Sequence, residues 1–492
     1  MSRKSSPAPG LDRATFEALG ARTIALAADH LETIEDRPVN RALPLELRRR
    51  LLGLELAEEG QDPRAIIDFV GATILPWPMG NGHPRFYAWV NSPPAPIAVL
   101  ADALAMTMNP SADGTEQAGR FLLKAVTRWL AELIGYPTDG TMGLLLGGGT
   151  MANLTALGVA RFAAARKAGW NVREQGLQGG HPPLIFYAAD EAHSCIRKSI
   201  EMLGIGTDNL RLIPTGIDCR MPLDILARTI ADDRAAGRLP ACVVASAGTV
   251  NIGAIDPLDA LADLCAAEGL WLHVDGAYGA FGRVDPAVAP LYRGLERADS
   301  VALDPHKWLS VPVECGAVLV RDAETQRAAY TLVPPYLDSA KTPDPDNPRW
   351  TMEYSFTLTS QLRAVKLYAA LAQMGRAGVR RMIASHNALA RGLAGRVAAR
   401  NDMEVMAPVT LSAVCFRYRP GAGADEAALD ALNGAIVEAL NAEGQVYIQT
   451  TRLKGRLAIR ACIMHFDNDE DDMAHLVERV AHWGGKLARS PA

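Results

Sequence analysis

Short runs of apolar residues alternate with helix-like segments through the middle of the chain, from about residue 109 to 374. The runs lie at 184–189, 210–214, 241–248, 270–279, 300–305 and 316–322. Segments between them, such as 223–236 and 257–268, have the spacing of helices. Continuous apolar strands that alternate with helices are typical of a mostly parallel sheet covered on both faces. The pattern therefore predicts an α/β fold with such a sheet.

The two ends of the chain have other patterns. Before residue 70, apolar residues such as Phe16 and Leu31 recur at helical spacing, and a proline-rich stretch at 75–96 follows, where we expect no regular structure. After Met374 we expect a long basic helix, then strands and a closing helix, as in a small α+β domain. The strands are expected around 411–418 and 456–462, and the helices at 376–400 and 469–487. We predict three parts: an N-terminal helical segment at 1–95, a large α/β domain at 96–375 and a small α+β domain at 376–492.

Composition and charge narrow the class of protein. The 492 residues include 50 Lys+Arg and 55 Asp+Glu, for a formal net charge of −5. No long basic run is present, and nucleic acid binding requires a concentrated positive field, so nucleic acid is not expected as a partner. A hydrophobic fraction of 49% supports a large core and excludes a disordered chain. A soluble enzyme is the expectation.

Cysteine usage and the N-terminus bear on the compartment. The seven cysteines form no C-x-x-C pair, and an odd number cannot close into disulfides within one chain, so we expect reduced, buried thiols. The N-terminus shows no apolar signal region, which favours a cytoplasmic location. The uncharged stretch 140–160 contains three consecutive glycines, Thr150 and Asn153. We interpret it as a strand, a glycine turn and a helix, and expect no membrane span.

Lys307 is the first candidate for chemistry. It lies in SVALDPHKWLSVP, between a predicted strand and an apolar run. A buried ammonium is costly unless it is paired or neutral, and a desolvated, neutral lysine is a nucleophile that forms Schiff bases with carbonyl compounds. The alternative is a surface lysine whose stem lies along apolar residues. The motif alone leaves both interpretations open.

Asp275 ends the apolar strand in WLHVDGAYG, where ligands of open α/β sheets gather. An acid there requires a positive partner, either a metal or the protonated ring nitrogen of a cofactor. His273 and Asp275 face the same side of a strand, so both are able to reach one ion, although no third ligand has matching spacing. A purely local role, with Asp275 capping the next turn, is a third interpretation.

The segment GGGTMANL at 147–154 follows an apolar strand and opens a helix. Backbone N–H groups of such a turn and the helix N-terminus suit a phosphate. The spelling G-x-G-x-x-A also fits a dinucleotide fingerprint, and so an NAD(P) oxidoreductase is an alternative. The polar segment that follows the helix lacks a strand ending in a ribose-binding acid, which argues against NAD.

Two further polar residues follow predicted strands. His193 lies in DEAHSCIRKS and Thr249 in ASAGTVNIGAID. A lone histidine is more often structural than chemical. At a strand end, however, its flat ring suits stacking on a cofactor and a hydrogen bond to a substrate carboxylate.

Together these signals point to one cofactor. Pyridoxal 5′-phosphate uses a Schiff-base lysine, an acid at its ring nitrogen, a phosphate cradle and an aromatic stacking partner. The segments HSCIRKSIEMLG, GTVNIGAIDPL, WLHVDGAYG and DPHKW also resemble, in order and wording, the group II pyridoxal-phosphate-dependent amino acid decarboxylases of fold type I, which include the aromatic-L-amino-acid decarboxylases. The resemblance runs from about His83 to Arg460.

The resemblance implies a role for each candidate. Lys307 would hold the cofactor, Asp275 would pair with its protonated ring nitrogen, and Ala277 and His193 would lie on the two faces of the ring. The remaining contacts would be Gly149 and Thr150 at the phosphate, His306 nearby and Thr249 close to the ring. The reaction would be decarboxylation of an L-amino acid to the amine and CO₂. Family members are homodimers, and the helices before Leu75 suit the dimer contact.

One departure from the family concerns the Cα proton donor. In the aromatic-amino-acid decarboxylases a loop tyrosine supplies this proton, and here Trp350 or Thr351 stands at its place. Tyr336 and Tyr354 flank the position, and we take Tyr354 as the candidate. Because related enzymes without the donor oxidise the substrate to an aldehyde, an aldehyde synthase is an alternative. A metal hydrolase using His273, Asp275, His193 and His306 is another. A second departure is the segment 109–119, which lacks the wording typical of the family's substrate loop and so weakens the expectation of an aromatic substrate. Phe86, Tyr87 and Trp89 are nevertheless able to supply an aromatic pocket.

Overall fold

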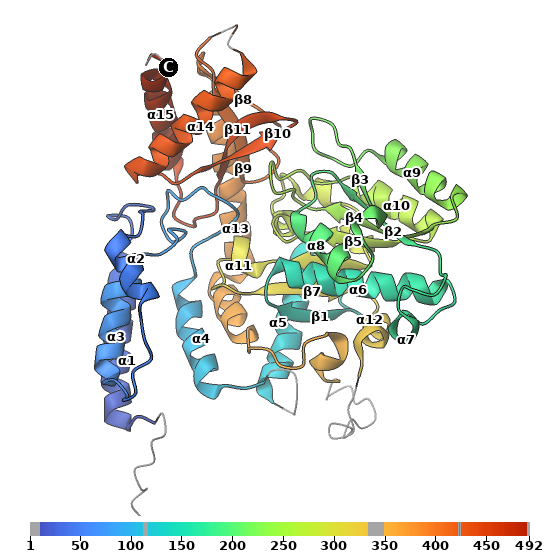
Figure 1. The fold of residues 1–492 in the computed structure, drawn as a ribbon, viewed down its shortest axis with the longest axis horizontal. Helices are drawn as coiled ribbons and strands as arrows, with labels where there is room; N and C mark the ends of the chain where they lie inside the picture. Colours follow the sequence, from blue (N-terminus) through green and yellow to red (C-terminus); the bar gives the residue numbers. More distant parts are fainter. Residues whose placement is uncertain (1–9, 112–116, 333–348, 422, 424, 490–492) are drawn as a thin grey trace, which may run out of the picture.

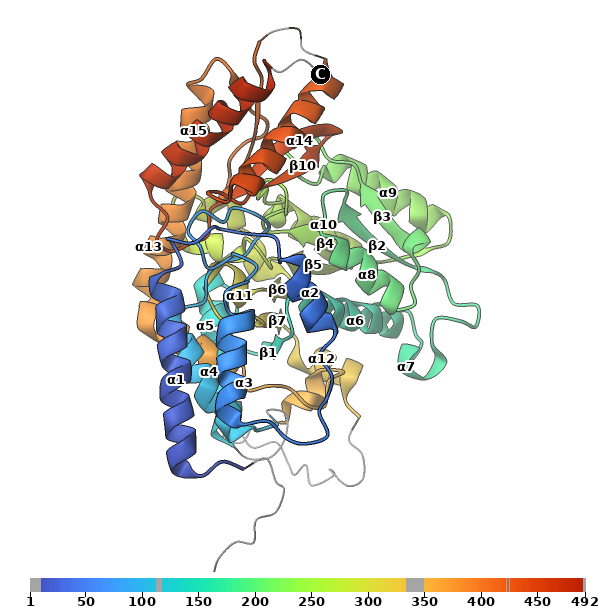
Figure 2. The same cartoon turned by 60° about the vertical axis from the view of Figure 1, so that its left-hand side comes forward.

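Two sheets organise the chain in the computed structural model, which describes residues 10–111, 117–332, 349–421, 423 and 425–489. A seven-stranded sheet forms the centre of the molecule, and a four-stranded sheet lies beside it, near the C-terminus (Figures 1 and 2). Tyr336 and the first nine residues are outside the described residues.

The large sheet has the strand order β1-β7-β6-β5-β4-β2-β3. Its strands are β1 Met142–Leu146, β2 Leu184–Ala189, β3 Leu210–Ile213, β4 Leu239–Ser246, β5 Trp271–Asp275, β6 Ser300–Leu303 and β7 Gly316–Val320. The five strands β6, β5, β4, β2 and β3 are parallel, and β7 runs antiparallel to both of its neighbours. The prediction of a mostly parallel sheet is therefore confirmed.

Helices cover both faces of this sheet. Alternate residues of one strand enter different clusters: in β2, Tyr187 packs in the cluster that holds α5, α9, α10 and α13, and Phe186 packs with α6 and α8. The helices of this region are α5 Ala118–Ile134, α6 Gly149–Lys167, α7 Val172–Gln175, α8 Ser194–Met202, α9 Leu223–Ala235, α10 Leu258–Glu268, α11 Pro305–Trp308 and α12 Ala323–Tyr330. Burial on both faces explains why the strands are continuously apolar.

The C-terminal part has its own core. Its elements are α13 Ala364–Ala398, β8 Met403–Val405, β9 Ala413–Tyr418, α14 Glu426–Glu443, β10 Gln449–Leu453, β11 Arg456–Cys462 and α15 Glu470–Leu487, and the sheet order is β10-β11-β9-β8. The sequence predicted β9 and β11 but missed β8 and β10. Gly375, with a left-handed φ of 59°, divides α13 into two helices, and the second of them begins where the basic helix was expected. The limits of the three predicted parts stay a prediction.

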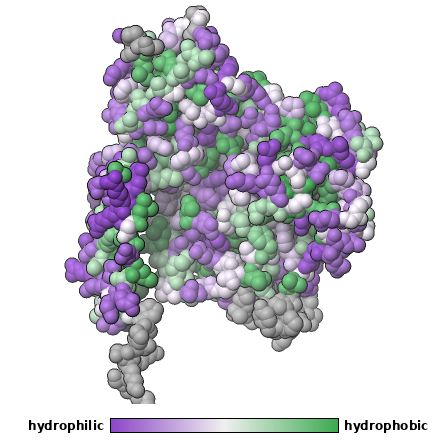
Figure 3. All heavy atoms as spheres, viewed as in Figure 1, coloured by the Kyte–Doolittle hydropathy of each residue, from purple (hydrophilic) through white to green (hydrophobic). Residues whose placement is uncertain are grey.

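The N-terminal helices stand at one side of the molecule (Figure 1). They are α1 Arg13–Glu32, α2 Leu45–Leu52, α3 Pro63–Phe69 with a π-helical turn at Val70–Ile74, and α4 Pro96–Met108. No residue of α1, α2 or α3 is buried, and α1 packs on α3. Apolar surface lies along these helices and in the hollow beside them (Figure 3). The stretch 75–95 contains no helix or strand, as expected.

Among the described residues, no helix is both long and apolar enough to cross a membrane. The uncharged stretch at 140–160 forms β1, the glycine turn and the start of α6, as predicted.

Three buried histidines predict a loss of stability in mild acid. Burial lowers the pKa of His83, His273 and His386 to about 4. As the pH falls from about 6.5 toward 4, the unfolded chain takes up protons that the native chain does not, so the free energy of unfolding decreases. The expected slope is about 1 kcal/mol per pH unit for each histidine. Urea unfolding at pH 6.5 and pH 5.0 measures it, and an unchanged midpoint would contradict the assignment.

Candidate active site

A cavity of about 580 Å³ lies at the carboxyl ends of the parallel strands. Its walls come from the segment 89–91, the glycine turn after β1, the ends of β4 and β5, the turn α11, and β10 and β11 of the small sheet. It gathers eight of the nine predicted site residues: Gly149, Thr150, His193, Thr249, Asp275, Ala277, His306 and Lys307. The structure therefore brings eight residues from separate segments of the sequence together in one cavity.

Lys307 lies in the single turn of α11 and is held by an ion pair that the sequence analysis did not foresee. Its Nζ lies 2.9 Å from Oδ2 of Asp304, whose side chain is only 3% exposed. Burial alone would lower the pKa of Lys307, but the Asp304 carboxylate outweighs it, and the pKa is raised. The paired carboxylate therefore favours the charged form of this amine.

Asp275 is the last residue of β5. Its Oδ1 accepts a hydrogen bond from the backbone N–H of Ala277 at 3.1 Å, which fixes the carboxylate at the edge of the sheet. No hydrogen bond to its Oδ2 is found among the residues that the structure describes. A carboxylate with one oxygen anchored and one available suits a single positive group in the cavity.

His193 caps the N-terminus of α8. Its Nδ1 accepts a hydrogen bond from the N–H of Cys195 at 3.2 Å, so a neutral ring carries its proton on Nε2. Burial lowers the pKa of His193, and the nearby Asp275 only partly offsets this effect. The ring is therefore neutral at pH 7 and keeps one N–H available to a ligand.

The glycine turn opens α6 toward the cavity. Gly148 has a left-handed φ of 94°, and no side chain caps the helix, so the first N–H groups of this 19-residue helix lack intrahelical partners. The turn is also tightly packed, because a Cβ on Gly149 would lie 2.6 Å from Oδ2 of Asp304 and 3.1 Å from Cβ of Ala277. Only glycine fits, and the free N–H groups and the helix dipole favour an anion.

Thr249 and His306 flank this region. The Oγ1 of Thr249 accepts a hydrogen bond from the N–H of Ala254 at 3.0 Å and keeps its own proton to donate. Nδ1 of His306 lies 3.0 Å from the carbonyl oxygen of Cys315, and its Nε2 is left for the cavity. Both side chains can therefore contribute hydrogen bonds to a ligand without losing the contacts that hold them.

These residues fit pyridoxal 5′-phosphate. The cavity offers one lysine amine, a carboxylate for a protonated ring nitrogen, a neutral flat ring, and an uncapped helix N-terminus for a phosphate. The methyl group of Ala277 leaves room for a planar ring where a larger side chain would fill it. The chemistry of the donor set matches the cofactor that the sequence predicted.

Three residues of the cavity were missed from the sequence: Asp304, Asn153 and Arg460. Nδ2 of Asn153 donates to the carbonyl oxygen of Gly149 at 2.9 Å and so steadies the glycine turn. Arg460 is only 4% exposed, and its Nη2 has no hydrogen-bond partner among the described residues. Two of them had a signal in the sequence. Arg460 is a charged residue inside the apolar run of β11, and Asp304 is an acid directly after β6.

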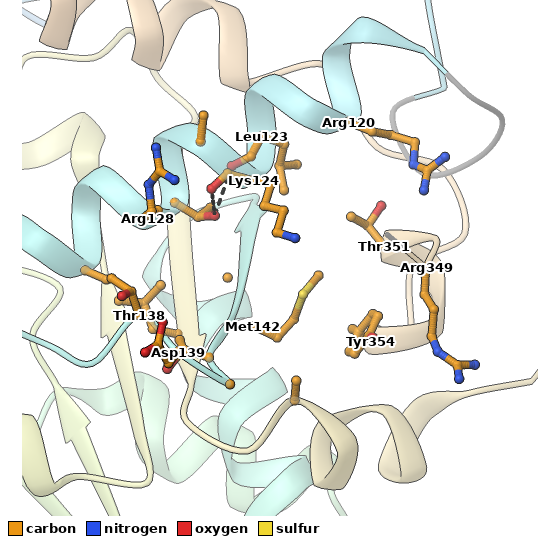
Figure 4. Close-up of a pocket in the computed structure, with 18 of the residues that line it drawn as sticks. Arg120, Leu123, Lys124, Arg128, Thr138, Asp139, Met142, Arg349, Thr351 and Tyr354 are labelled. Carbon is orange, nitrogen blue, oxygen red and sulfur yellow. Dashed lines mark hydrogen bonds between the residues drawn. The ribbon is translucent and has the colours of Figure 1, made fainter. Parts of the chain in front are cut away.

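Tyr354 lies outside this cavity. It lines a second cavity of about 600 Å³ between α5, β1 and the short turn at Thr351–Tyr354, together with Thr351, Arg120 and Lys124 (Figure 4). Its side chain is 6% exposed. Within one chain the structure does not bring Tyr354 to Lys307, and its role as a proton donor stays a prediction.

His273 does not support the metal alternative. Its Nε2 donates to Oδ1 of Asn153 at 2.7 Å, and its Nδ1 accepts from Oγ of Ser300 at 2.9 Å. Both ring nitrogens are therefore occupied inside the sheet. No group of three or more His, Cys, Asp or Glu side chains suited to a metal is found among the described residues.

The aromatic residues of HPRFYAW divide between the cavity and the core. Trp89 lines the cavity, whereas Tyr87 is fully buried in the core of the small sheet and Phe86 stacks on Tyr447 at 5.3 Å between ring centroids. Of the three residues expected to form an aromatic pocket, only Trp89 is placed to do so. The prediction for Phe86 and Tyr87 is wrong because their rings close the seam between this segment and the small sheet.

Comparison with known proteins agrees with the site. Residues 44–419 match the family described as the pyridoxal-dependent decarboxylase conserved domain. The aromatic-L-amino-acid decarboxylase of Bacillus atrophaeus is 30% identical, over 94% of each chain. The L-2,4-diaminobutyrate decarboxylase of Rhizobium meliloti (strain 1021) is 31% identical, over 88% of this chain and 84% of the relative. The phenylacetaldehyde synthase of Petunia hybrida is 27% identical, over 92% and 91%.

Among solved structures, that of Oryza sativa TDC with PLP and tryptamine superposes with a TM-score of 0.89 at 26% identity and covers 98% of this chain and 100% of that chain. The chain belongs to the pyridoxal-dependent decarboxylase family. It is a pyridoxal-phosphate-dependent amino acid decarboxylase with the fold-type I architecture. The family and the donor set leave no support for an NAD(P) oxidoreductase at the 147–152 turn.

Proposed function

We propose that this decarboxylase acts on an aromatic L-amino acid and releases the amine and CO₂. The observation that carries the proposal is the gathering of eight predicted cofactor-binding residues in one cavity, with Trp89 at its wall. The bacterial relative named for aromatic amino acids, similar over 94% of each chain, supports this substrate class.

The chain's own residues divide the work. When bound, the cofactor supplies an electron sink for the carbanion that remains after CO₂ leaves. Lys307 would provide the amine that holds the cofactor. Asp275 would keep a proton on its ring nitrogen by charge, His193 and Ala277 would lie on either side of the ring, and the α6 N-terminus would bind the phosphate. Contacts from Gly149, Thr150, Thr249 and His306 complete this proposed set.

Arg460 is the residue best placed for the substrate carboxylate. Its Nε and Nη1 donate to the carbonyl oxygens of Asn251 and Trp89 at 3.1 and 2.8 Å, so the guanidinium is fixed while Nη2 lacks a partner among the described residues. A fixed, buried cation whose Nη2 lacks a partner favours a single carboxylate.

Reduction of the cofactor complex tests the site. The full chain is mixed with pyridoxal phosphate, its absorption spectrum is recorded before and after borohydride, and the modified peptide is identified by mass spectrometry. We expect a borohydride-sensitive band and a label on Lys307. The absence of the band, or a label on another lysine, would reject the proposed site.

A second candidate is an aldehyde synthase, because Tyr354 lies outside the cavity and a relative is named phenylacetaldehyde synthase. In that reaction O₂ takes two electrons and two protons from the decarboxylated substrate and becomes H₂O₂, and water then hydrolyses the resulting imine to aldehyde and ammonia. Amine, aldehyde and peroxide are assayed for each member of an amino acid panel. We expect amine in equal amount to CO₂; aldehyde with matching peroxide would establish the second candidate.

We also propose a homodimer. The helices α1, α2 and α3 contain no buried residue, and they and α4 carry exposed apolar side chains, of which Phe16, Leu52, Leu104 and Met108 are each more than half exposed. Apolar surface of this extent requires a cover, and a second copy provides a matching face. Sedimentation equilibrium is expected to give twice the mass of 52.7 kDa; a monomer would refute it.

A cytoplasmic location is the last part of the proposal. All seven cysteines are free and buried. Such thiols suit a reducing compartment, in which disulfides rarely form. Fractionation of the native cells is expected to recover the activity with the cytosol.

A further inference from the structure

Asp304 is the one group that holds the amine of Lys307. Its Oδ2 lies 2.9 Å from Nζ, and no other hydrogen bond to Nζ is found among the described residues. Asp304 is 3% exposed, and its Oδ1 has no hydrogen bond there either, although Nδ1 of His306 lies 3.7 Å away. The carboxylate is therefore buried, whereas the side chain of Lys307 is 22% exposed toward the cavity.

The carboxylate of Asp304 lies next to the glycine turn. It lies against Gly149, at the uncapped N-terminus of α6, where the helix dipole favours negative charge. Lys307 supplies the opposite charge. Asp304 therefore places a carboxylate beside the amine of Lys307, which must lose its proton to become a nucleophile.

We propose that Asp304 sets the protonation state of Lys307 and keeps its amine as an ammonium in the protein before the cofactor is bound. Asp304 acts here as a positioning residue, through Lys307. The proposal rests on the proposed role of Lys307 and adds a determinant of when that amine becomes reactive.

Other titratable groups also face Lys307, and each is a weaker determinant. Asp275, at the end of β5, raises the pKa of Lys307 less than Asp304 does. Burial keeps the Cys195 thiol and the His193 ring neutral, since it raises the pKa of the thiol and lowers that of the ring. The groups around the amine are thus Asp304, Asp275, His193 and Cys195, while His306 faces Asp304.

The test follows the titration of Lys307 in the cofactor-free full chain. Formaldehyde with cyanoborohydride methylates only neutral amines, and mass spectrometry gives the rate at the Lys307 peptide as a function of pH. In the wild type we expect a midpoint above that of the exposed Lys124 in the same sample. In Asp304→Asn burial remains without the paired charge, so the midpoint is expected to fall by about 1–3 pH units, which raises the rate at pH 8 by about tenfold or more.

Two variants serve as controls. Asp304→Glu retains the charge and is expected to restore a midpoint close to that of the wild type, and Asp275→Asn is expected to shift it less than Asp304→Asn. A wild-type midpoint at or below that of Lys124 would overturn the proposal, even where Asp304→Asn does not fold. Equal midpoints for folded Asp304→Asn and wild type would also overturn it. Because the readout needs neither cofactor nor turnover, it is independent of the decarboxylase assay.

Discussion

Replacement of Lys307 by alanine is expected to lower the decarboxylase rate on the order of 10³-fold or more, because no other lysine lines the cavity among the described residues. The variant loses the amine that binds the cofactor and that later displaces the product. The borohydride-sensitive absorption is expected to disappear with the activity. CO₂ release and the absorption spectrum measure the two effects.

The matched control for Lys307→Ala is Lys124→Ala. Lys124 is exposed, and it lines the second cavity and not the first. We expect this variant to keep the activity and the spectrum of the wild type. If Lys307→Ala retained more than a tenth of the wild-type rate, another group would have to supply the amine, and the assignment of the site would fail.

Replacement of Asp275 by asparagine is expected to lower kcat roughly 100-fold or more while the cofactor still binds. The amide keeps the shape of the carboxylate and can still accept from the N–H of Ala277, but it lacks the charge that holds a proton on the ring nitrogen. Without that proton the ring accepts electrons less well. Steady-state kinetics and cofactor titration separate the two quantities.

A charge-preserving variant completes the Asp275 experiment. Asp275→Glu keeps the charge but moves the carboxylate by one methylene group, so we expect an intermediate rate. If Asp275→Asn turned over as fast as the wild type, the ionic partnership of Asp275 with the cofactor would be disproved. If it lost the cofactor entirely, Asp275 would act in binding and not in the chemistry.

Much of the large sheet was predictable because its strands are buried on both faces and therefore continuously apolar. Lys307, Asp275 and His193 could be singled out for a related reason, since Asp275 ends such a strand and the other two lie in the segments that follow one. The strands β8 and β10 were not, because they lie at the edges of the small sheet, where exposure permits a polar composition. Pairing with β9 and β11, and not local propensity, makes them strands.

Long-range contacts escaped prediction in the site as well. Arg460 lies about 150 residues after Lys307 in sequence, and only the docking of β11 brings it to the cavity. The ion pair of Lys307 was hidden for another reason. Asp304 is three residues away, but its carboxylate faces Nζ only because α11 forms a helical turn after Pro305. Tyr354 is close in sequence to the expected position of the proton donor, but the turn at Thr351–Tyr354 places it beside α5 and β1.

The cavity has walls from both sheets, with Gln449, Thr450 and Arg460 contributed by the small one. A ligand bound there touches the two halves of the molecule at once, so its binding energy also resists their separation. Cofactor occupancy is therefore expected to merge the melting of the two halves into one cooperative transition, and to shield the interrupted helix at Gly375 from proteases. Cells that are short of the vitamin precursor would then lose the protein itself, by turnover, as well as its activity.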